Sequence, residues 1–114
     1  MSEVICINGQ FTNDQLEFWA KYNVKCPEQD KLYTIRDVVR NTDGSIGLHL
    51  EEIHNPTIPI NHPILGVAMI EPNFDINRFR QLDGSPLNAT ELMSIFRVQI
   101  QTVKIKNYDN VFKN

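Results

Sequence analysis

The feature that most constrains this fold is a predicted β-hairpin in the middle of the chain. Residues 32–40 and 46–52 are two segments in which apolar and polar side chains alternate, as they do in β-strands, and residues 41–45 form a turn sequence between them. Within that turn, Gly44 can adopt the positive φ that a tight connection needs. Because segment 32–40 has apolar residues on both faces, it resembles a strand of a small barrel. The sequence therefore predicts antiparallel β-sheet around this hairpin.

The second segment of the hairpin has an inward and an outward side. Alternation turns three side chains toward the core and two toward solvent: Ile46, Leu48 and Leu50 inward, His49 and Glu51 outward. The pattern fails at residues 52–53, where we expect a bulge or the end of the strand. Residues 4–7 and 64–70 are also rich in β-branched or apolar side chains, and we predict a further strand in each.

A helix is predicted after the first strand. Thr12 and Gln15 have the spacing of a capping box, so the helix should begin at Thr12, and it should end near Asn23. Its apolar residues recur at helical spacing, and we expect three of them to face the core: Leu16, Trp19 and Ala20.

A second helix is predicted near the C-terminus, where Asn88 and Glu91 repeat the capping pattern. Apolar residues at helical spacing would carry this helix past residue 100, but residues 98–101 also alternate as a strand does. Periodicity leaves both alternatives open. Residues 104–114 contain more apolar side chains than a free tail would expose, so we expect them to dock on their own domain or on a neighbouring subunit.

Residues 54–63 contain three prolines and are predicted to form a loop rather than a central strand. The loop also carries Ile58 and Ile60. Long loops without regular structure are uncommon unless they are functional, so these isoleucines either pack over the core or bind a partner.

The stretch 74–82 places two arginines beside aromatic residues. If the chain turns at Ile76 and then extends, alternation points Phe79 inward and both Arg78 and Arg80 outward. Phe74 and Phe79 would then close the core. The two guanidinium groups would be free either to pair with nearby carboxylates or to bind a ligand.

Length and charge limit the class of protein. The 114 residues suit one domain, with a barrel core at about 4–82 and a C-terminal extension at about 83–114. A net charge of -3 argues against nonspecific coating of DNA or RNA. The first residues contain neither a basic run nor a long apolar region, so we expect a soluble intracellular protein with reduced thiols at Cys6 and Cys26, and no association with a membrane.

No catalytic or metal-binding motif is visible in the sequence. Cys6 near a histidine would be the only candidate for nucleophilic catalysis, and the glycines are too scattered for a phosphate-binding loop. Several side chains could in principle ligate a metal, but their spacing matches no known site: His49, His54, His62, Cys26, Glu51 and Glu52. Solvated side chains are the simpler interpretation, and we expect no cofactor and no enzyme activity.

Four sequence segments together resemble a family of small uncharacterised phage and prophage proteins. The segments are Tyr33-Thr34-Ile35-Arg36, residues 47–53 (Gly-Leu-His-Leu-Glu-Glu-Ile), Asn55-Pro56, and residues 74–82 with their Arg-Phe-Arg centre. The resemblance covers about residues 4–82 and implies an SH3-like β-barrel of viral origin, located in the cytoplasm of an infected bacterium. The helix at 12–22, the proline-rich loop and the C-terminal extension depart from the shorter members, and they are the parts that could form a homo-oligomer.

The arginines lead to a functional hypothesis. Guanidinium groups bind phosphate in a bidentate manner, and aromatic rings stack on bases. We therefore predict a non-enzymatic protein that sequesters a small nucleotide-like anion, such as an immune signal of the host, with these residues: Arg78, Arg80, Arg36, Arg40, Tyr33, Phe74 and Trp19. The alternatives are a module that binds a host or virion protein through residues 58–60 and 108–112, and an enzyme acting on a nucleotide. Ion pairing of the arginines with Glu51, Glu52 or Asp75 would leave only a structural role.

Overall fold

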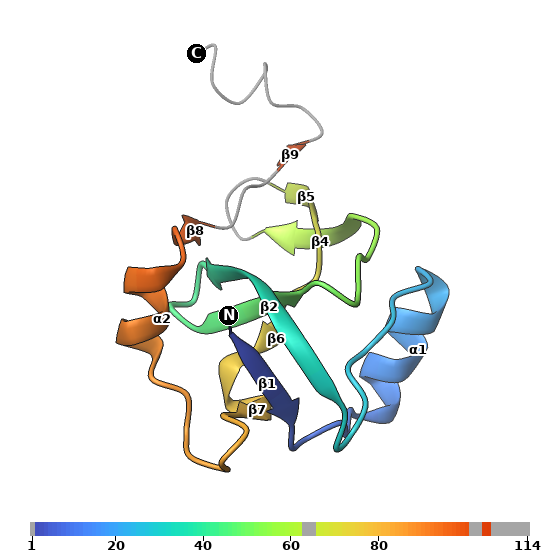
Figure 1. Cartoon of the computed structure of the whole chain (residues 1–114). Helices are drawn as coiled ribbons and strands as arrows, with labels where there is room; N and C mark the ends of the chain where they lie inside the picture. The colour runs from blue at the N-terminus through green and yellow to red at the C-terminus, as the bar shows by residue number, and fades with distance from the viewer. Residues whose placement is uncertain (1, 63–65, 101–103, 106–114) are drawn as a thin grey trace.

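The computed structural model describes residues 2–62, 66–100 and 104–105, and these residues form a mainly β protein with two α-helices (Figure 1). This class was predicted from the sequence. The elements, in chain order, are β1 (Glu3–Cys6), α1 (Asn13–Lys21), β2 (Leu32–Arg40), β3 (Ile46–Leu50), β4 (Ile58–His62), β5 (Gly66–Ile70), β6 (Phe74–Asp75), the 3-10 helix η1 (Ile76–Arg78), β7 (Phe79–Arg80), α2 (Ala89–Ile95), β8 (Gln99–Ile100) and β9 (Lys104–Ile105).

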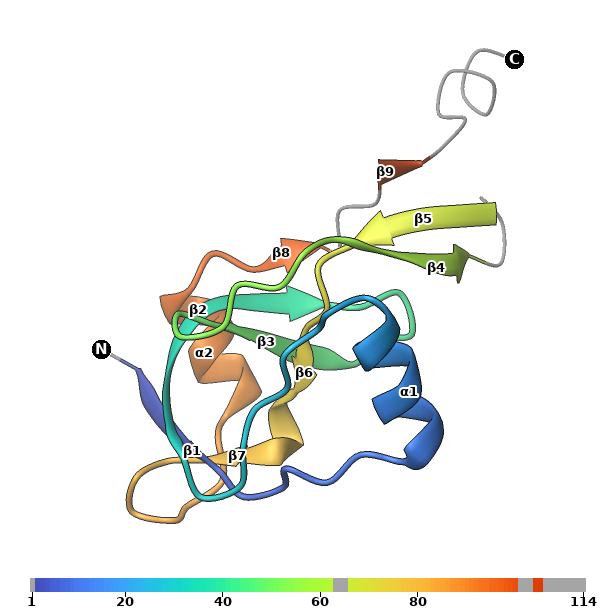
Figure 2. The ribbon, with the colours of Figure 1, turned by 90° about the vertical axis from the view of Figure 1, so that its right-hand side faces the viewer.

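The main sheet has the strand order β6-β3-β2-β1-β7, with antiparallel neighbours, and β8 pairs in parallel with the end of β2. The predicted hairpin is confirmed as β2 and β3, with Gly44 at φ 87° in the turn. The prediction of a closed barrel is wrong. β6 and β7 occupy opposite edges of the described sheet and are joined by the single turn η1, so the sheet bends back without closing (Figure 2).

A bulge in β2 changes which side chains face the core. Ile35 pairs with Leu50, whereas Asp37 pairs with His49, so Arg36 is an extra residue without a partner in β3. The extra residue shifts the alternation by one position. Tyr33 and Ile35 are buried before the bulge and Val38 after it, whereas the unbroken pattern would turn Val38 to the opposite face from Ile35. Of the two alternatives expected near residue 52, a bulge or the end of the strand, the structure has the end: β3 stops at Leu50 and a turn follows. The bulge on β2 was not predicted.

The core lies on one side of this bent sheet. Its centre is fully buried, and the residues with at most 4% exposure include Val4, Cys6, Tyr33, Ile35, Val38, Leu48, Leu50, Phe74 and Phe79. The rings of Tyr33 and Phe79 meet edge to face, with centroids 6.5 Å apart. Phe74 and Phe79 therefore close the core, as predicted.

The two helices differ in how they contact this core. Leu92 of α2 is 7% exposed and belongs to the core cluster. No residue of α1 is buried, and Leu16 is 48% exposed, so the prediction that Leu16, Trp19 and Ala20 face the core is wrong. Phe11 before the helix and Val24 after it pack on the core in place of the helix residues. The helix itself lies to one side of the main sheet (Figure 1).

Residues 54–63 are not wholly a loop. Residues 58–62 form β4, an edge strand of a separate sheet with the order β4-β5-β9. An edge position tolerates Pro59 because one side of the strand has no ladder to complete. Ile58 is 1% exposed, so its side chain packs inside the protein and is not accessible to a partner. The strand predicted at 64–70 is described from Gly66 onward.

The C-terminal part resolves the ambiguity between helix and strand. α2 ends at Ile95, and residues 99–100 and 104–105 form the strands β8 and β9. Of the predicted docked tail, only β9 is described, and it pairs with β5. Residues 106–114 lie outside the described ranges.

The stretch 74–82 contains the predicted turn but is less extended than expected. The turn at Ile76 is confirmed as η1, which also contains Arg78. Before this turn Phe74 and Asp75 form β6; after it only Phe79 and Arg80 are in a strand, and residues 82–84 form another turn. Arg78 therefore lies outside the sheet, and strand alternation does not relate its side chain to that of Arg80.

Candidate functional site

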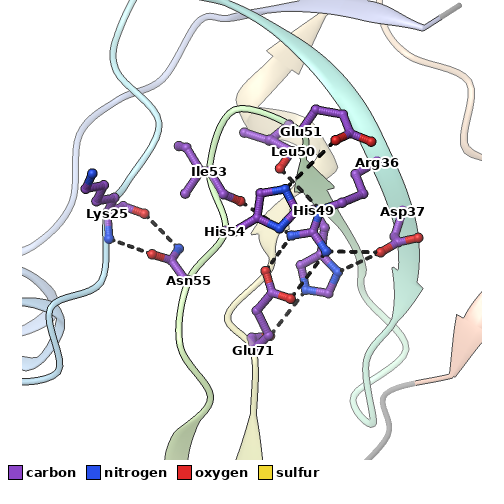
Figure 3. Close-up of polar contacts among 10 residues, drawn as sticks. All are labelled: Lys25, Arg36, Asp37, His49, Leu50, Glu51, Ile53, His54, Asn55 and Glu71. Atoms are coloured by element: carbon purple, nitrogen blue, oxygen red, sulfur yellow. Dashed lines mark hydrogen bonds and ion pairs between the residues drawn. The ribbon is translucent and has the colours of Figure 1, made fainter.

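Arg36 is the centre of a polar cluster on the bulge of β2 (Figure 3). Its Nη2 lies 2.5 Å from Glu71 Oε2, and its Nη1 lies 3.4 Å from both Glu71 Oε1 and Asp37 Oδ2. Its Nε and Nη2 also donate to the carbonyl oxygens of Leu50 and Ile53, each at 3.4 Å. These acceptors surround the guanidinium group, so a phosphate could bind Arg36 only by displacing them.

His49 completes this cluster. The sequence places it at the surface, but it is only 9% exposed. Its Nε2 lies 3.3 Å from the carbonyl oxygen of Glu71, and its Nδ1 lies 3.5 Å from Asp37 Oδ2. A carboxylate beside an imidazole can orient a general base, but catalysis also needs a nucleophile within reach, and the described contacts of His49 include none. The described residues contain no group of three or more His, Cys, Asp or Glu arranged to hold a metal ion.

Arg78 connects η1 to the segment before α1. Its Nη1 donates to the carbonyl oxygens of Asn8 at 3.0 Å and Gln10 at 2.8 Å. Its guanidinium carbon lies 3.9 Å from the centre of the Phe11 ring. These contacts hold residues 8–11 against η1 through two hydrogen bonds and a cation–π interaction.

Arg80 makes one described hydrogen bond, from Nη1 to the carbonyl oxygen of Phe79 at 3.1 Å. In the described part of the chain, neither Arg78 nor Arg80 pairs with a carboxylate. The carboxylates expected to neutralise them have other partners. Glu52 accepts from the backbone N–H of Thr34, Asp75 accepts from that of Asn77, and Glu51 lies near His54.

The aromatic residues expected to stack on a base are mostly inaccessible. Tyr33 is 2% exposed and Phe74 is 4% exposed. The hydroxyl oxygen of Tyr33 accepts from the backbone N–H of Glu28 at 2.8 Å. Trp19 is half-buried on α1, and its Nε1 has no hydrogen-bond partner among the described residues. A base could reach Trp19 more readily than the other two rings.

The predicted site residues are therefore spread across the fold. Arg40 is exposed at the end of β2, where its Nη2 lies 3.6 Å from the sulfur of Met93 on α2. Trp19 is on α1, and Arg78 and Arg80 are on η1 and β7. Each residue is explained by its own local contacts, and the described contacts do not join them into one site.

A cavity of about 510 Å³ lies between β1, the 81–88 connection and α2. Its volume is within the usual range for sites that bind ligands, roughly 300 to 1,000 Å³. Core residues and partly exposed aliphatic residues line it together: Val4, Ile35, Leu92, Leu82, Leu87 and Ile95. Leu82 is 55% exposed and Ile95 is 62% exposed, so apolar surface continues from the cavity to solvent.

Acidic residues line the polar part of this cavity. Glu3, Asp83 and Glu91 belong to its lining, and none of the described lining residues is basic. Hydrogen bonds from the hydroxyl and backbone N–H groups of Ser85 hold the pKa of Asp83 below its ordinary value, so this carboxylate is ionised at neutral pH. The sequence prediction missed this site because three separate segments form it. The exposed Leu82 beside the Asp83-Gly84 turn was the available signal.

Both cysteines are free thiols in the structure, as predicted. Burial raises the pKa of the Cys6 thiol above its ordinary value and has the same effect on Cys26. A raised pKa lowers the thiolate fraction at neutral pH, which is the opposite of what a nucleophilic cysteine needs.

Comparisons with protein-family models, with curated proteins and with solved structures gave no match to this chain. Within the described ranges, neither helix has the length and apolar character required to cross a bilayer.

Proposed function

We propose that this protein is a non-enzymatic interaction module that binds a partner protein at the cavity beside α2. The observation that carries the proposal is the continuity between buried and exposed apolar surface at this place. Leu82 and Ile95 stand at the mouth of the cavity with more than half of their surface exposed, and Leu92 lies buried next to them. A cavity with aliphatic side chains at its mouth can take up an apolar side chain of a partner as an anchor.

The contacts of the arginines favour this module over a phosphate-binding clamp. Arg36 is surrounded by two carboxylates and two carbonyl oxygens, and Arg78 is held by two carbonyl oxygens and Phe11. A ligand would have to displace these groups before it could use either arginine. The cavity beside α2 needs no such rearrangement.

A selection with short random peptides displayed on phage tests the interaction module. Peptides selected on the wild-type protein should bind the Leu82→Ser and Ile95→Ser variants at least about tenfold more weakly, because each change removes an apolar anchor contact worth about 1.4 kcal/mol or more. Leu16→Ser is the matched control, because Leu16 is a similarly exposed leucine, at 48%, on α1. Failure to select peptides, or equal binding to all variants, would overturn the proposal.

The nucleotide-binding hypothesis stays as a second proposal, and one observation favours it. Arg78 and Arg80 are two residues apart, neither has a carboxylate partner in the described structure, and their Nη2 groups make no described hydrogen bond. Purified protein incubated with cyclic and linear nucleotides would be heated, and the released molecules identified. Intact release from wild type but not from Arg80→Ala would support sequestration, and altered nucleotides would instead indicate an enzyme.

The proposal extends to the kind of protein. We infer an SH3-like arrangement, which is supported by the order β6-β3-β2-β1-β7 and by the 3-10 turn that joins the two edge strands. The sequence resemblance supports an origin in a phage or prophage and a location in the cytoplasm of the bacterial host. A homo-oligomer remains part of this proposal, and a measured mass in solution tests it directly.

A further inference from the structure

The charge around the cavity beside α2 indicates which partner chemistry it suits. Among the described lining residues, three are acidic and none is basic. Glu3 lies on β1, Asp83 on the connection that follows β7, and Glu91 in the first turn of α2, so the negative charge comes from three separate elements. Their carboxylates contribute up to three negative charges, as many as the net charge of the whole chain, -3.

Asp83 and Glu91 each have a role in the local structure, but each still has a carboxylate oxygen that could contact a partner. Asp83 Oδ1 accepts both hydrogen bonds from Ser85, and Oδ2 makes no described contact. Glu91 is favourably placed near the N-terminal end of α2, and its side chain makes no described hydrogen bond or ion pair. Glu3 likewise has no described side-chain partner. The three charges are thus not neutralised by cations in the described part of the chain.

We propose that the occupant of this cavity is a basic peptide segment of a partner protein, in which Lys or Arg flanks an aliphatic side chain. This proposal rests on the interaction module proposed above and specifies the partner's chemistry. The aliphatic side chain enters between Leu82, Leu92 and Ile95, and the flanking cations lie against the three carboxylates. An anionic partner would meet uncompensated like charge at the same place.

The geometry also assigns different roles to the two parts of the surface. The apolar anchor contacts hold the complex together, because they are shielded from water when the peptide is bound. The carboxylates at the edge stay accessible to solvent, so they select the sign of the partner's charge and raise the rate of association. The affinity for the peptide should therefore fall as ionic strength rises. The place where its aliphatic side chain binds, between Leu82, Leu92 and Ile95, should stay the same.

The peptide selection described above gives the first test. Peptides that bind wild type should be enriched in Lys and Arg next to Leu, Ile, Val or Met. Selection on the variant Glu3→Gln/Asp83→Asn/Glu91→Gln should lose the basic enrichment and keep the aliphatic residue. Asn at position 83 can still accept from Ser85, so the turn is retained. Glu17→Gln, on the exposed surface of α1, is the matched control and should select the same basic peptides as wild type.

A selected basic peptide then gives the quantitative test. Each single neutralisation should weaken binding by about two- to fivefold, the effect of one exposed ion pair. The triple variant should weaken it by roughly ten- to a hundredfold, because effects at separate sites add in free energy. Wild-type binding should weaken similarly at about 1 M salt, where the Debye length is about 3 Å. Thermal melting of each variant checks that the fold is retained.

The outcomes separate the two proposals. Neutral or acidic peptides that lose binding in Leu82→Ser and Ile95→Ser would support an interaction module and overturn the basic partner. Basic peptides whose binding is unaffected by the triple variant would also overturn it. If no peptide is selected, or if binding ignores Leu82 and Ile95, both proposals fail. Spermidine, tested alone, should bind only weakly, and competition by spermidine equal to that of the peptide would assign the site to a small polycation instead.

Discussion

Both α-helices in the described part of the chain begin at a side chain that caps the first turn, but only one of them belongs to the core. Thr12 and Gln15 form a complete capping box at α1, and Asn88 accepts from the backbone N–H of Glu91 at α2. α2 buries Leu92, whereas α1 buries no residue. A capping motif therefore determines where a helix starts, but the segments around the helix determine whether it packs on the core.

This difference has a consequence for function. Because α2 is anchored by Leu92, its exposed Ile95 is held at a fixed place beside the cavity. α1 also exposes large apolar side chains, Leu16 and Phe18, but the ring of Phe18 packs on its own helix neighbours Trp19 and Tyr22. Exposed apolar residues on an anchored helix next to a cavity are a better candidate binding surface than those on a helix outside the core.

The largest expected effect comes from truncating the anchor of α2. Leu92→Ala should lower the free energy of unfolding by roughly 2 to 5 kcal/mol, because it leaves a cavity in the core. Leu16→Ala, the same change on α1, should stay within about 0.5 kcal/mol because Leu16 is largely exposed. Urea denaturation of both variants measures the difference. Equal losses would mean that α1 contributes to the core as much as α2 does.

Substitution of the N-cap residues should have a smaller effect on stability, and it tests whether each helix unfolds with the core. Asn88→Ala should lower the global free energy of unfolding by about 1 kcal/mol, because α2 unfolds together with the core. Thr12→Ala should instead act locally, by reducing the hydrogen-exchange protection of the α1 amides more than the protection of β2 and β3. Asn88→Asp and Thr12→Ser keep an acceptor and are the controls. A uniform loss of protection in Thr12→Ala would show that α1 unfolds only with the whole domain.

The same contrast shows what the sequence could predict. Local signals located the starts of both helices, the hairpin turn around Gly44 and the turn at Ile76, because neighbouring residues determine these features. The buried position of Phe79 also followed from simple alternation. What failed depended on distant contacts. The apolar side of α1 was wrongly predicted to face the core, because periodicity identifies an apolar stripe on a helix but not the surface on which that stripe packs.

The candidate site was harder to predict for the same reason. The bulge that places Arg36 against Glu71 depends on the pairing of β2 with β3, which the alternation of neither strand reveals. The carbonyl oxygens of Asn8 and Gln10, 70 and 68 positions away in the sequence, accept hydrogen bonds from Arg78. An arginine in a sequence shows a charge but not the acceptors that will surround it. The cavity beside α2 likewise exists only after three distant segments have come together.

The smallest expected effect comes from a substitution in the turn at residues 83–85, before α2, and the similar turn at residues 43–45 is its internal control. Residues 83–85 repeat the Asp-Gly-Ser sequence of residues 43–45, and in both turns the Ser hydroxyl and backbone N–H donate to the Asp carboxylate. These bonds hold the pKa of Asp43 and the pKa of Asp83 below the ordinary value. Ser85→Ala should therefore raise the pKa of Asp83 and leave that of Asp43 unchanged, as measured by NMR titration.

The sign of the accompanying pH effect follows from the direction of these shifts. A carboxyl group whose pKa is lower in the folded state stabilises the fold above its unfolded pKa of about 3.9, and this contribution is lost as the pH falls through the folded value. Ser85→Ala should reduce the acid-dependent part of stability without disturbing Leu92, so α2 stays docked. If α2 loses its hydrogen-exchange protection in this variant at neutral pH, then the turn, and not only the buried leucine, holds the anchored helix in place.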